Sequence, residues 1–292
     1  MRKKAIFILT LMLLVGVSGL RAAEAYVYLD TTDGCLYFCY DNNRSSRKFT
    51  TYDLNTGKNE PKWSSIADQV KTAYFTTGFA NYTPTTCYKW FYDMKNLTNV
   101  AYITRLNTSN VTFMGFMFSG CSSLTSLNLS NFNTANITNM AYMFNGCSKL
   151  SSLNLSSFTI PANTSGMMKG CTSLSSLTVP SSGNTLSSDA CEGVGTKAAP
   201  STLVYPEGFK PEKTSMGKGW YMWKSGYFKE TGGIRGDANG DGEVSLIDVM
   251  ITVEYYLGNN PQDFIFTNAE MDDDDEISLS DLLGIVDIIL NQ

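Results

Sequence analysis

The chain has 292 residues, a formal net charge of −5 and no histidine. Without histidine it lacks the commonest general base and the Ser/His and Cys/His nucleophile pairs. The charge is uneven, because residues 236–292 carry 14 acidic and no basic side chains, whereas residues 100–180 contain no acid. A glycosidase carboxylate pair therefore has no obvious place in the middle of the chain. Lys and Arg do not cluster, so we expect neither an enzyme nor a nucleic-acid-binding protein.

Residues 1–25 have the plan of a secretory signal peptide. Three basic residues at positions 2–4 precede an apolar run over residues 5–20, and Ala23-Glu24-Ala25 offers a cleavage site. The alternative is a retained membrane helix, but the apolar run falls short of the roughly 18 to 20 residues that a span needs. We therefore expect a secreted protein, extracellular or on a bacterial cell surface, with no membrane span after signal removal.

Residues 26–86 are expected to form a β-rich N-terminal cap. Aromatic and β-branched runs at residues 26–29 and 35–40 flank Thr31-Thr32-Asp33-Gly34, which is a hairpin signal. A capping segment is needed here because the end of a stacked-repeat array exposes a hydrophobic cross-section.

Residues 87–229 contain a pattern that recurs every 24 to 27 residues, which is typical of a stacked-repeat architecture. In the clearest copy, Met140, Met143, Phe144 and Cys147 have the spacing of one helix face, and the alternating leucines at 153 and 155 predict a strand. The fold class expected is therefore α/β, a solenoid with a short helix and a strand per repeat. The Met/Phe stripe is expected to form core; the alternative is a ligand groove.

The seven cysteines permit either disulfides or a buried ladder of thiols. Export would allow disulfides, but the number is odd, and Cys121, Cys147 and Cys171 recur at one position of successive repeats. A small, readily buried side chain suits a stacked interior, which favours the ladder.

One repeat, residues 117–140, reads MFSGCSSLTSLNLSNFNTANITNM. It resembles the leucine-rich repeat of the BspA-like family of bacterial surface proteins, in the variant M-F-x-x-C-x-x-L-x-x-L-x-L-S-x-F-x-T-x-x-x-T-x-M. The resemblance covers about residues 26–228 and implies recognition of a host protein or glycan. We expect the ligand surface at polar positions between the leucines, including Ser126, Asn128, Ser152 and Asn154. The aromatic run at residues 220–228 is expected to form the C-terminal cap; the alternative is stacking on sugars.

A short linker at residues 230–235 precedes two copies, 33 residues apart, of a calcium-loop pattern. Oxygen-bearing side chains stand at loop positions 1, 3, 5, 9 and 12, the spacing with which a chain wraps a hard cation. Position 7 of each loop contributes a backbone carbonyl, and the side chain at that position is included with the candidate residues. The candidate ligands of loop 1 are Asp237, Asn239, Asp241, Glu243, Ser245 and Asp248. Those of loop 2 are Glu270, Asp272, Asp274, Glu276, Ser278 and Asp281. The alternative is a solvated acidic tail.

Because each loop closes on Asp and is followed by a helix, residues 236–292 resemble a type I dockerin. The resemblance implies a small all-α domain that binds two calcium ions and docks to a cohesin-like domain. Its recognition positions fall on Leu246, Ile247, Leu279 and Ser280. The second site is expected to be weaker, because Glu270 replaces the family's Asp and Asp275 its Gly. Two helical stripes are expected to pack together: Val249, Met250, Val253 and Leu257 with Leu282, Leu283, Val286 and Leu290.

Together these features predict an exported, non-enzymatic surface protein whose repeats bind a protein or glycan and whose tail docks it to a cohesin-bearing scaffold. Two other functions stay open. The chain is alternatively an accessory component of a polysaccharide-degrading complex, or a passive spacer with a calcium-stabilised end domain.

Overall fold

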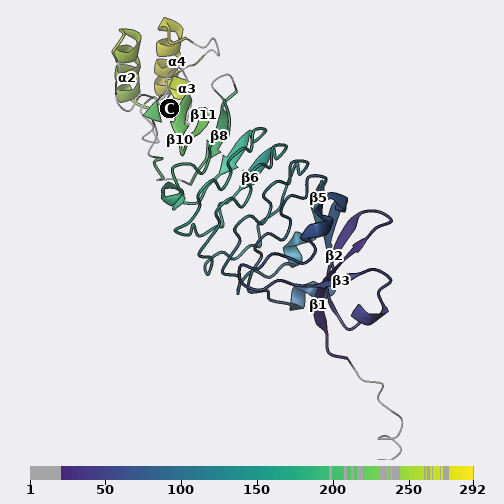
Figure 1. Cartoon of the computed structure of the whole chain (residues 1–292). Helices are drawn as coiled ribbons and strands as arrows, with labels where there is room; N and C mark the ends of the chain where they lie inside the picture. Colours follow the sequence, from purple (N-terminus) through teal and green to yellow (C-terminus); the bar gives the residue numbers. More distant parts are fainter. Residues whose placement is uncertain are drawn as a thin grey trace, which may run out of the picture.

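The computed structural model describes residues 21–196, 199–206, 209–211, 214–215, 220–229, 236, 238, 244–259, 261, 264, 266–269, 271 and 276–291. Within these residues the protein is β-rich. An N-terminal sheet leads into a β-solenoid of about five coils, which ends in a second sheet, and a group of helices follows near the C-terminus (Figure 1).

The N-terminal sheet has the strand order β3-β1-β2-β4-β5. Its strands are β1 (Glu24–Asp30), β2 (Cys35–Asp41), β3 (Thr51–Asp53), β4 (Thr72–Phe75) and β5 (Asn99–Ala101). Strands β1 and β2 pair antiparallel from Glu24↔Asp41 to Asp30↔Cys35, so the predicted hairpin is confirmed. Strand β1 already begins at Glu24, so two residues that the sequence assigns to the signal peptide belong to this sheet.

The coils are held together by hydrogen bonds to the next coil, and the predicted helix in each repeat is wrong. Residues 141–146 form turns. Met140 N and Phe144 N donate to carbonyls of the following coil, Asn163 O at 2.9 Å and Met167 O at 2.8 Å. Tyr142 has φ +56°, a left-handed conformation that an α-helix cannot include. The helical spacing arises because a chain of tight turns also points Met140, Met143, Phe144 and Cys147 inward.

The predicted strands are confirmed only in part. Strands β6 (Ser152–Asn154) and β7 (Ser176–Thr178) follow the leucine alternation and pair in parallel, but residues 124–129 form no regular strand. Short 3₁₀ helices occupy several corners of the chain. They are η1 (Arg44–Ser46), η2 (Ser64–Gln69), η3 (Thr77–Asn81), η4 (Ile103–Arg105) and η5 (Gly183–Thr185).

The solenoid interior stacks identical side chains on one another. Phe91, Phe118 and Phe144 are fully buried, with ring centroids 5.0 and 5.8 Å apart along the stack. All seven cysteines are buried and none is in a disulfide, so the thiol ladder is confirmed. Each thiol in the ladder donates to a carbonyl of the preceding coil, for example Cys147 Sγ to Phe118 O at 3.1 Å.

The far end of the solenoid is closed by strands β8 (Ser201–Val204), β9 (Thr214–Ser215), β10 (Trp220–Trp223) and β11 (Gly226–Lys229). The second sheet has the order β6-β7-β8-β11-β10-β9. Tyr221, Trp223 and Phe228 are buried against the solenoid core, as predicted for a cap and not for a sugar platform.

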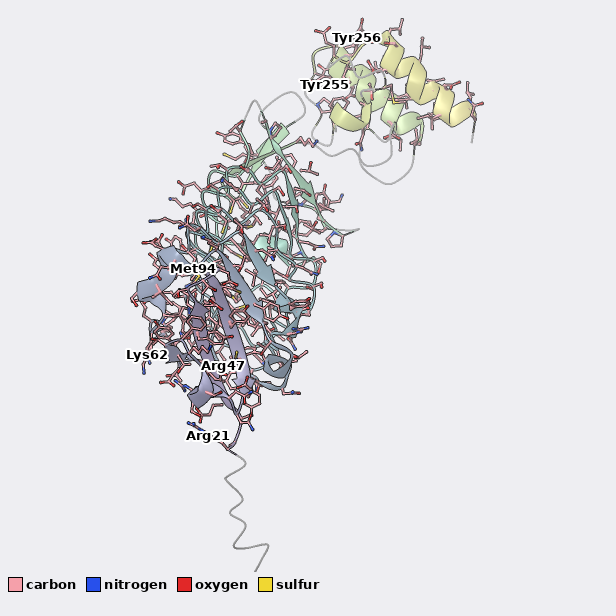
Figure 2. The ribbon with its side chains drawn as sticks, turned by 90° about the vertical axis from the view of Figure 1, so that its right-hand side faces the viewer. Arg21, Arg47, Lys62, Met94, Tyr255 and Tyr256 are labelled. Carbon is pink, nitrogen blue, oxygen red and sulfur yellow. The ribbon has the colours of Figure 1, made fainter. Side chains whose placement is uncertain are left out.

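In the tail, the described residues form helices α2 (Leu246–Tyr256), α3 (Phe266–Ala269) and α4 (Leu279–Leu290). Helices α2 and α4 contact each other, and Figure 2 shows Tyr255 and Tyr256 on the first of them. No helix in the described part of the chain is long and apolar enough to cross a membrane. The predicted linker, residues 230–235, lies outside the described residues.

The predicted packing of the two helical stripes is partly wrong. Leu282 is buried and Val249 packs against the small core of the tail, but Met250, Leu257, Leu283 and Leu290 are exposed. The buried face is instead centred on Ile285 and on Asp248, Thr252 and Asp281. Because the closing Asp of each loop is turned inward at the first helical turn, the buried face is rotated away from these four apolar residues.

Candidate functional site

The four polar positions predicted as a ligand surface all lie exposed on the open face of the solenoid sheet. Ser152 and Asn154 belong to β6, and Ser126 and Asn128 occupy the same positions one coil earlier. The backbone ladder fixes that register, since Ser151 N donates to Thr125 O and Ser175 N to Ser151 O. The structure therefore places these side chains in two parallel rows that run across the coils, with the leucines between them facing the core.

Each asparagine of this face is held by its own backbone. Asn128 Oδ1 accepts from Ser130 N at 3.1 Å, and Asn154 Oδ1 accepts from Ser156 N at 2.9 Å. These bonds fix the amide plane, so the side chains enter any contact with little loss of rotamer freedom.

A strip of tyrosines on the N-terminal sheet extends the same row and was not predicted. Tyr28 is paired with Tyr37, and Tyr37 with Tyr74, so all three share one face of the sheet. Their ring centroids are 4.9 and 5.5 Å apart, and Tyr102 continues the strip 5.1 Å from Tyr74. Tyr74 is paired with Ala101, which stands one repeat of 27 residues before Asn128.

Arginines cover both ends of this tyrosine strip. Arg105 lies 4.0 Å above the ring of Tyr102, and its Nη1 donates to Phe75 O at 2.8 Å. At the other end, Arg47 lies 5.0 Å above Tyr28 and donates to Asp41 at 2.7 Å. Figure 2 shows Arg47 at the N-terminal sheet.

The strip consists of residue types that are common in binding surfaces, but Tyr28 is buried and Tyr37 and Tyr74 are half-buried. Tyr and Arg supply large, partly rigid contact areas with polar tips, and both are enriched in the energetically dominant parts of interfaces. Tyr102 is half exposed and adopts φ +55°, a conformation that a bulky residue seldom takes. In the sequence, Tyr26 and Tyr28 alternate along one strand and Tyr37 lies in the next, which was a signal for this face. This signal predicts only that the tyrosines share a face. It does not predict that the strip joins the asparagine row.

Most of the predicted calcium ligands lie outside the described residues. These are Asp237, Asn239, Asp241, Glu243, Glu270, Asp272 and Asp274. The described ones are Ser245, Asp248, Glu276, Ser278 and Asp281. Among the residues that the structure describes, no group of three potential ligands is close enough together to hold a metal ion.

The two loop exits have the same local structure. Ser245 caps α2, and Asp248 Oδ2 accepts from Ser245 N at 2.8 Å and from Ser245 Oγ at 3.2 Å. Ser278 and Asp281 repeat this reciprocal cap at α4, with distances of 2.8 and 3.0 Å. The cap accounts for one carboxylate oxygen of each Asp, and the other oxygen of Asp281 accepts from Met271 N.

The donor set at these exits fits a hard divalent cation. Asp248 and Asp281 are fully buried, and residues 236–292 contain no Lys or Arg that would neutralise them. A buried carboxylate is costly unless it is hydrogen-bonded or paired, and both aspartates accept hydrogen bonds within the described residues. Calcium takes such oxygens, and Asp248 and Asp281 would each hold an ion at the last position of its loop.

The four predicted partner-binding residues are exposed at the start of the two helices. Leu246 is 69 % exposed and Leu279 63 % exposed, and they occupy equivalent positions in the first turn of α2 and α4. Ile247 and Ser280 follow at equivalent places, both exposed. Neither leucine contributes to the core of the tail, so both are available for contact with another molecule.

The thiol ladder, in contrast, is chemically quiet. Burial raises the pKa of Cys171 to about 12 and raises the pKa of Cys121, Cys147 and Cys191 still further. A thiol that stays protonated and out of contact with water is neither a nucleophile nor a metal ligand. The cysteines therefore belong to the core and not to the site.

Comparison with known proteins gives one partial match. Neither a leucine-rich repeat family nor a dockerin family was found. No curated protein and no solved structure matches the chain. Residues 85–181, roughly a third of the chain, are similar to the family described as "Mycoplasma protein of unknown function, DUF285", and this segment contains both asparagines of the exposed row.

Proposed function

We propose that this chain is an exported, non-enzymatic recognition protein. Its solenoid binds a protein or glycan through the open sheet face, and its tail is a calcium-dependent docking module for a cohesin-like domain on a scaffold. The observation that carries the recognition half is the row that runs from the half-buried Tyr37 and Tyr74 to the exposed Asn128 and Asn154. These side chains are aligned across successive coils.

The asparagine part of the row supports recognition because it is separate from what stabilises the fold. The leucines and phenylalanines between these positions are buried, whereas Asn128 and Asn154 are exposed. A face that the core does not need is free to vary in sequence, and the sheet beneath it fixes its geometry.

The tail supports docking by its internal duplication. Both loop exits have the same Ser/Asp cap, and both helices expose a leucine in the first turn. Exposed apolar residues on a small helical surface are typical of protein contact sites. The closing aspartates make that surface dependent on the cation, because the helices begin where the ligands end.

The recognition half is tested by changing the row without changing the fold. Asn128→Asp with Asn154→Asp keeps the oxygen that accepts the local backbone hydrogen bond but alters the surface charge. We expect binding on glycan and host-protein arrays to fall at least tenfold. Asn107→Asp is the matched control, because Asn107 is exposed and its Oδ1 accepts from Ser109 N in the same way.

Equal binding by the double variant and the control would reject the asparagine row as the ligand surface. Complete lack of binding by the unaltered chain would favour a passive spacer. Hydrolysis of a polysaccharide by the purified chain would favour the accessory-enzyme function instead.

The docking half is tested with the full chain and immobilised cohesin-like domains. We expect capture in calcium and none after EDTA. Leu246→Asp with Leu279→Asp should abolish capture while calcium binding measured by calorimetry persists, because both leucines are exposed whereas the closing aspartates are buried. Capture that is unaffected by the double variant would assign docking to another surface.

A further inference from the structure

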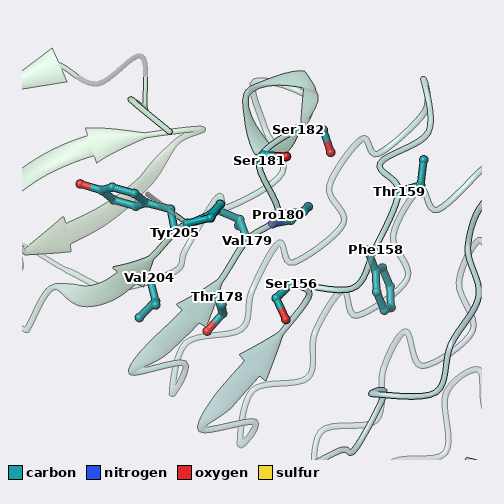
Figure 3. A pocket seen from close by; sticks show the side chains of 11 residues that line it. Ser156, Phe158, Thr159, Thr178, Val179, Pro180, Ser181, Ser182, Val204 and Tyr205 are labelled. Carbon is teal, nitrogen blue, oxygen red and sulfur yellow. The ribbon is translucent and has the colours of Figure 1, made fainter. Parts of the chain in front are cut away.

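A groove of about 580 Å³ opens beside the C-terminal ends of three successive strands of the solenoid (Figure 3). Its volume lies within the range of small-molecule sites. None of Ser126, Asn128, Ser152 and Asn154 lines it, but it adjoins their row, because Thr178 in the lining pairs with Asn154. The lining comes from three coils: Ser156, Phe158, Thr159, Thr178, Val179, Pro180, Ser181, Ser182, Val204, Tyr205 and Pro206.

The groove exists because one of the stacks of side chains stops. The rings of Phe132 and Phe158 stack with centroids 6.3 Å apart. Leu153 pairs with Leu177, an offset of 24 residues, and the same offset from Phe158 leads to Ser182. A small hydroxyl residue thus stands where a third ring would continue the stack, and the space beside Phe158 is left open.

The lining carries hydroxyl groups and apolar surface, and no charge. Figure 3 shows Ser156 and Thr178 on neighbouring coils, with Pro180 and Val179 beside them. Within the described structure, no hydrogen bond uses the side-chain hydroxyl of Ser156, Thr178 or Ser181. These hydroxyls both donate and accept, so they suit a ligand that is itself rich in hydroxyl groups.

Other ligand classes fit the groove less well. An anionic ligand would lack a Lys or Arg among the lining residues. An added peptide strand would need an open sheet edge, but β7 is paired with β6 and β8, and β8 with β7 and β11. Pro180 and Pro206 have no backbone N–H to offer to a peptide.

We propose that this groove is a subsite for an uncharged saccharide, bound by the hydroxyls of Ser156 and Thr178 and packed on the accessible apolar faces of Val204, Tyr205 and Pro206. This proposal rests on the recognition function proposed above. It specifies one class of ligand for the solenoid, the end of a glycan chain. A sugar ring complements this lining, because it carries hydroxyl donors and acceptors for the serine and threonine hydroxyls and an apolar C–H face for the apolar side chains.

The test uses saturation-transfer NMR of the full chain with maltose, cellobiose and lactose, and with glucuronic acid as a charged comparison. At least one disaccharide should bind and glucuronic acid should not. Ser182→Phe, which continues the ring stack into the groove, should remove binding. Thr178→Val should weaken it by about three- to tenfold, the effect of one hydrogen bond. Thr125→Val makes the same chemical change at an exposed position outside the groove and should leave binding unchanged.

The proposal is overturned if no disaccharide binds, if glucuronic acid binds equally well, or if Ser182→Phe remains folded and still binds. If Ser182→Phe fails to fold, Thr178→Val against Thr125→Val decides. These failures leave the recognition function intact, because that function is tested separately by the Asn128 and Asn154 variants on glycan and host-protein arrays.

Discussion

The solenoid and the tail achieve stability in different ways. In the solenoid, rings and thiols are stacked from coil to coil, and one continuous core runs from the N-terminal sheet to Phe228. In the tail, the buried apolar residues among those described are few: Ala238, Val244, Ala269, Leu282 and Ile285. Its interior also holds two buried aspartates.

From this difference we infer where the proposed calcium contributes to folding. A stack of coils adds buried apolar area with every repeat, so its stability grows without any cofactor. A segment of about 57 residues with few large buried side chains cannot do this, and the buried acids oppose it further. Under the function proposed above, recognition and stability are independent in the solenoid, whereas in the tail both depend on the proposed cation.

The largest expected effect is therefore that of calcium removal. With EDTA, hydrogen exchange of the full chain should lose all protection in α2 and α4, because Asp248 and Asp281 repel the other loop acids once the ion is gone. The coils around Phe144 should keep their protection, and serve as the internal control. Protection of both helices that is unchanged by EDTA would show that the tail folds without a metal.

A cavity in the ring stack should have the next largest effect. Phe144→Ala removes a fully buried ring that stacks on Phe118, and should lower the free energy of unfolding by about 3–5 kcal/mol. Phe116→Ala is a matched control in the neighbouring coil, because Phe116 is only half-buried, and should cost less than half as much. Urea denaturation measures both, and equal losses would contradict the assignment of core and surface rings.

Two neighbouring leucines of α4 distinguish the packing in the structure from the packing that the sequence pattern predicts. Leu282→Ala should destabilise the calcium-loaded tail by about 2–5 kcal/mol, because the side chain is buried. Leu283→Ala should change stability by less than about 0.5 kcal/mol, because Leu283 is 61 % exposed. The melting of the helices, followed by circular dichroism in calcium, distinguishes them. Comparable losses of stability would instead support the buried stripe that the sequence predicts, in which both leucines face the core.

These residues also show how far the sequence reaches. The repeat, the N-terminal hairpin and the buried cysteines follow from spacing alone, because period and burial are local properties of the pattern. The turns that replace the predicted helix in each coil do not follow from spacing. Tyr142 and Gly146 adopt left-handed backbone angles, which the spacing of apolar residues does not encode. A hydrogen bond from Tyr142 N to Ser165 O depends on the next coil, which no single repeat specifies.

The site was predictable to a similar degree. Asn128 and Asn154 were found because alternation distinguishes the open face from the core. The tyrosine strip was missed, because Tyr28, Tyr37 and Tyr74 become neighbours only through one antiparallel and one parallel pairing. In the tail, the exposed Leu283 was misassigned because the inward turn of Asp281 rotates the helix, and a carboxylate is not expected at the centre of a buried face.

The smallest expected effect is the pH dependence of stability that arises from the buried thiols. Burial raises the pKa of Cys171 from 9.0 to about 12, so the folded chain keeps this proton in a range where the unfolded chain loses it. The stabilisation is therefore complete below pH 9 and is lost as the pH rises from 9 towards 12, by about 1.4 kcal/mol per pH unit for one thiol. Urea midpoints at pH 8, 9 and 10 measure the slope. Other groups also titrate in this pH range, so the slope is compared with that of Cys171→Ala. The free energy of unfolding of this variant should fall less steeply with pH, by about 1.4 kcal/mol per pH unit. Identical slopes would mean that the thiol reaches solvent, and the same accessibility would then have to appear as rapid alkylation of Cys171 in the folded protein.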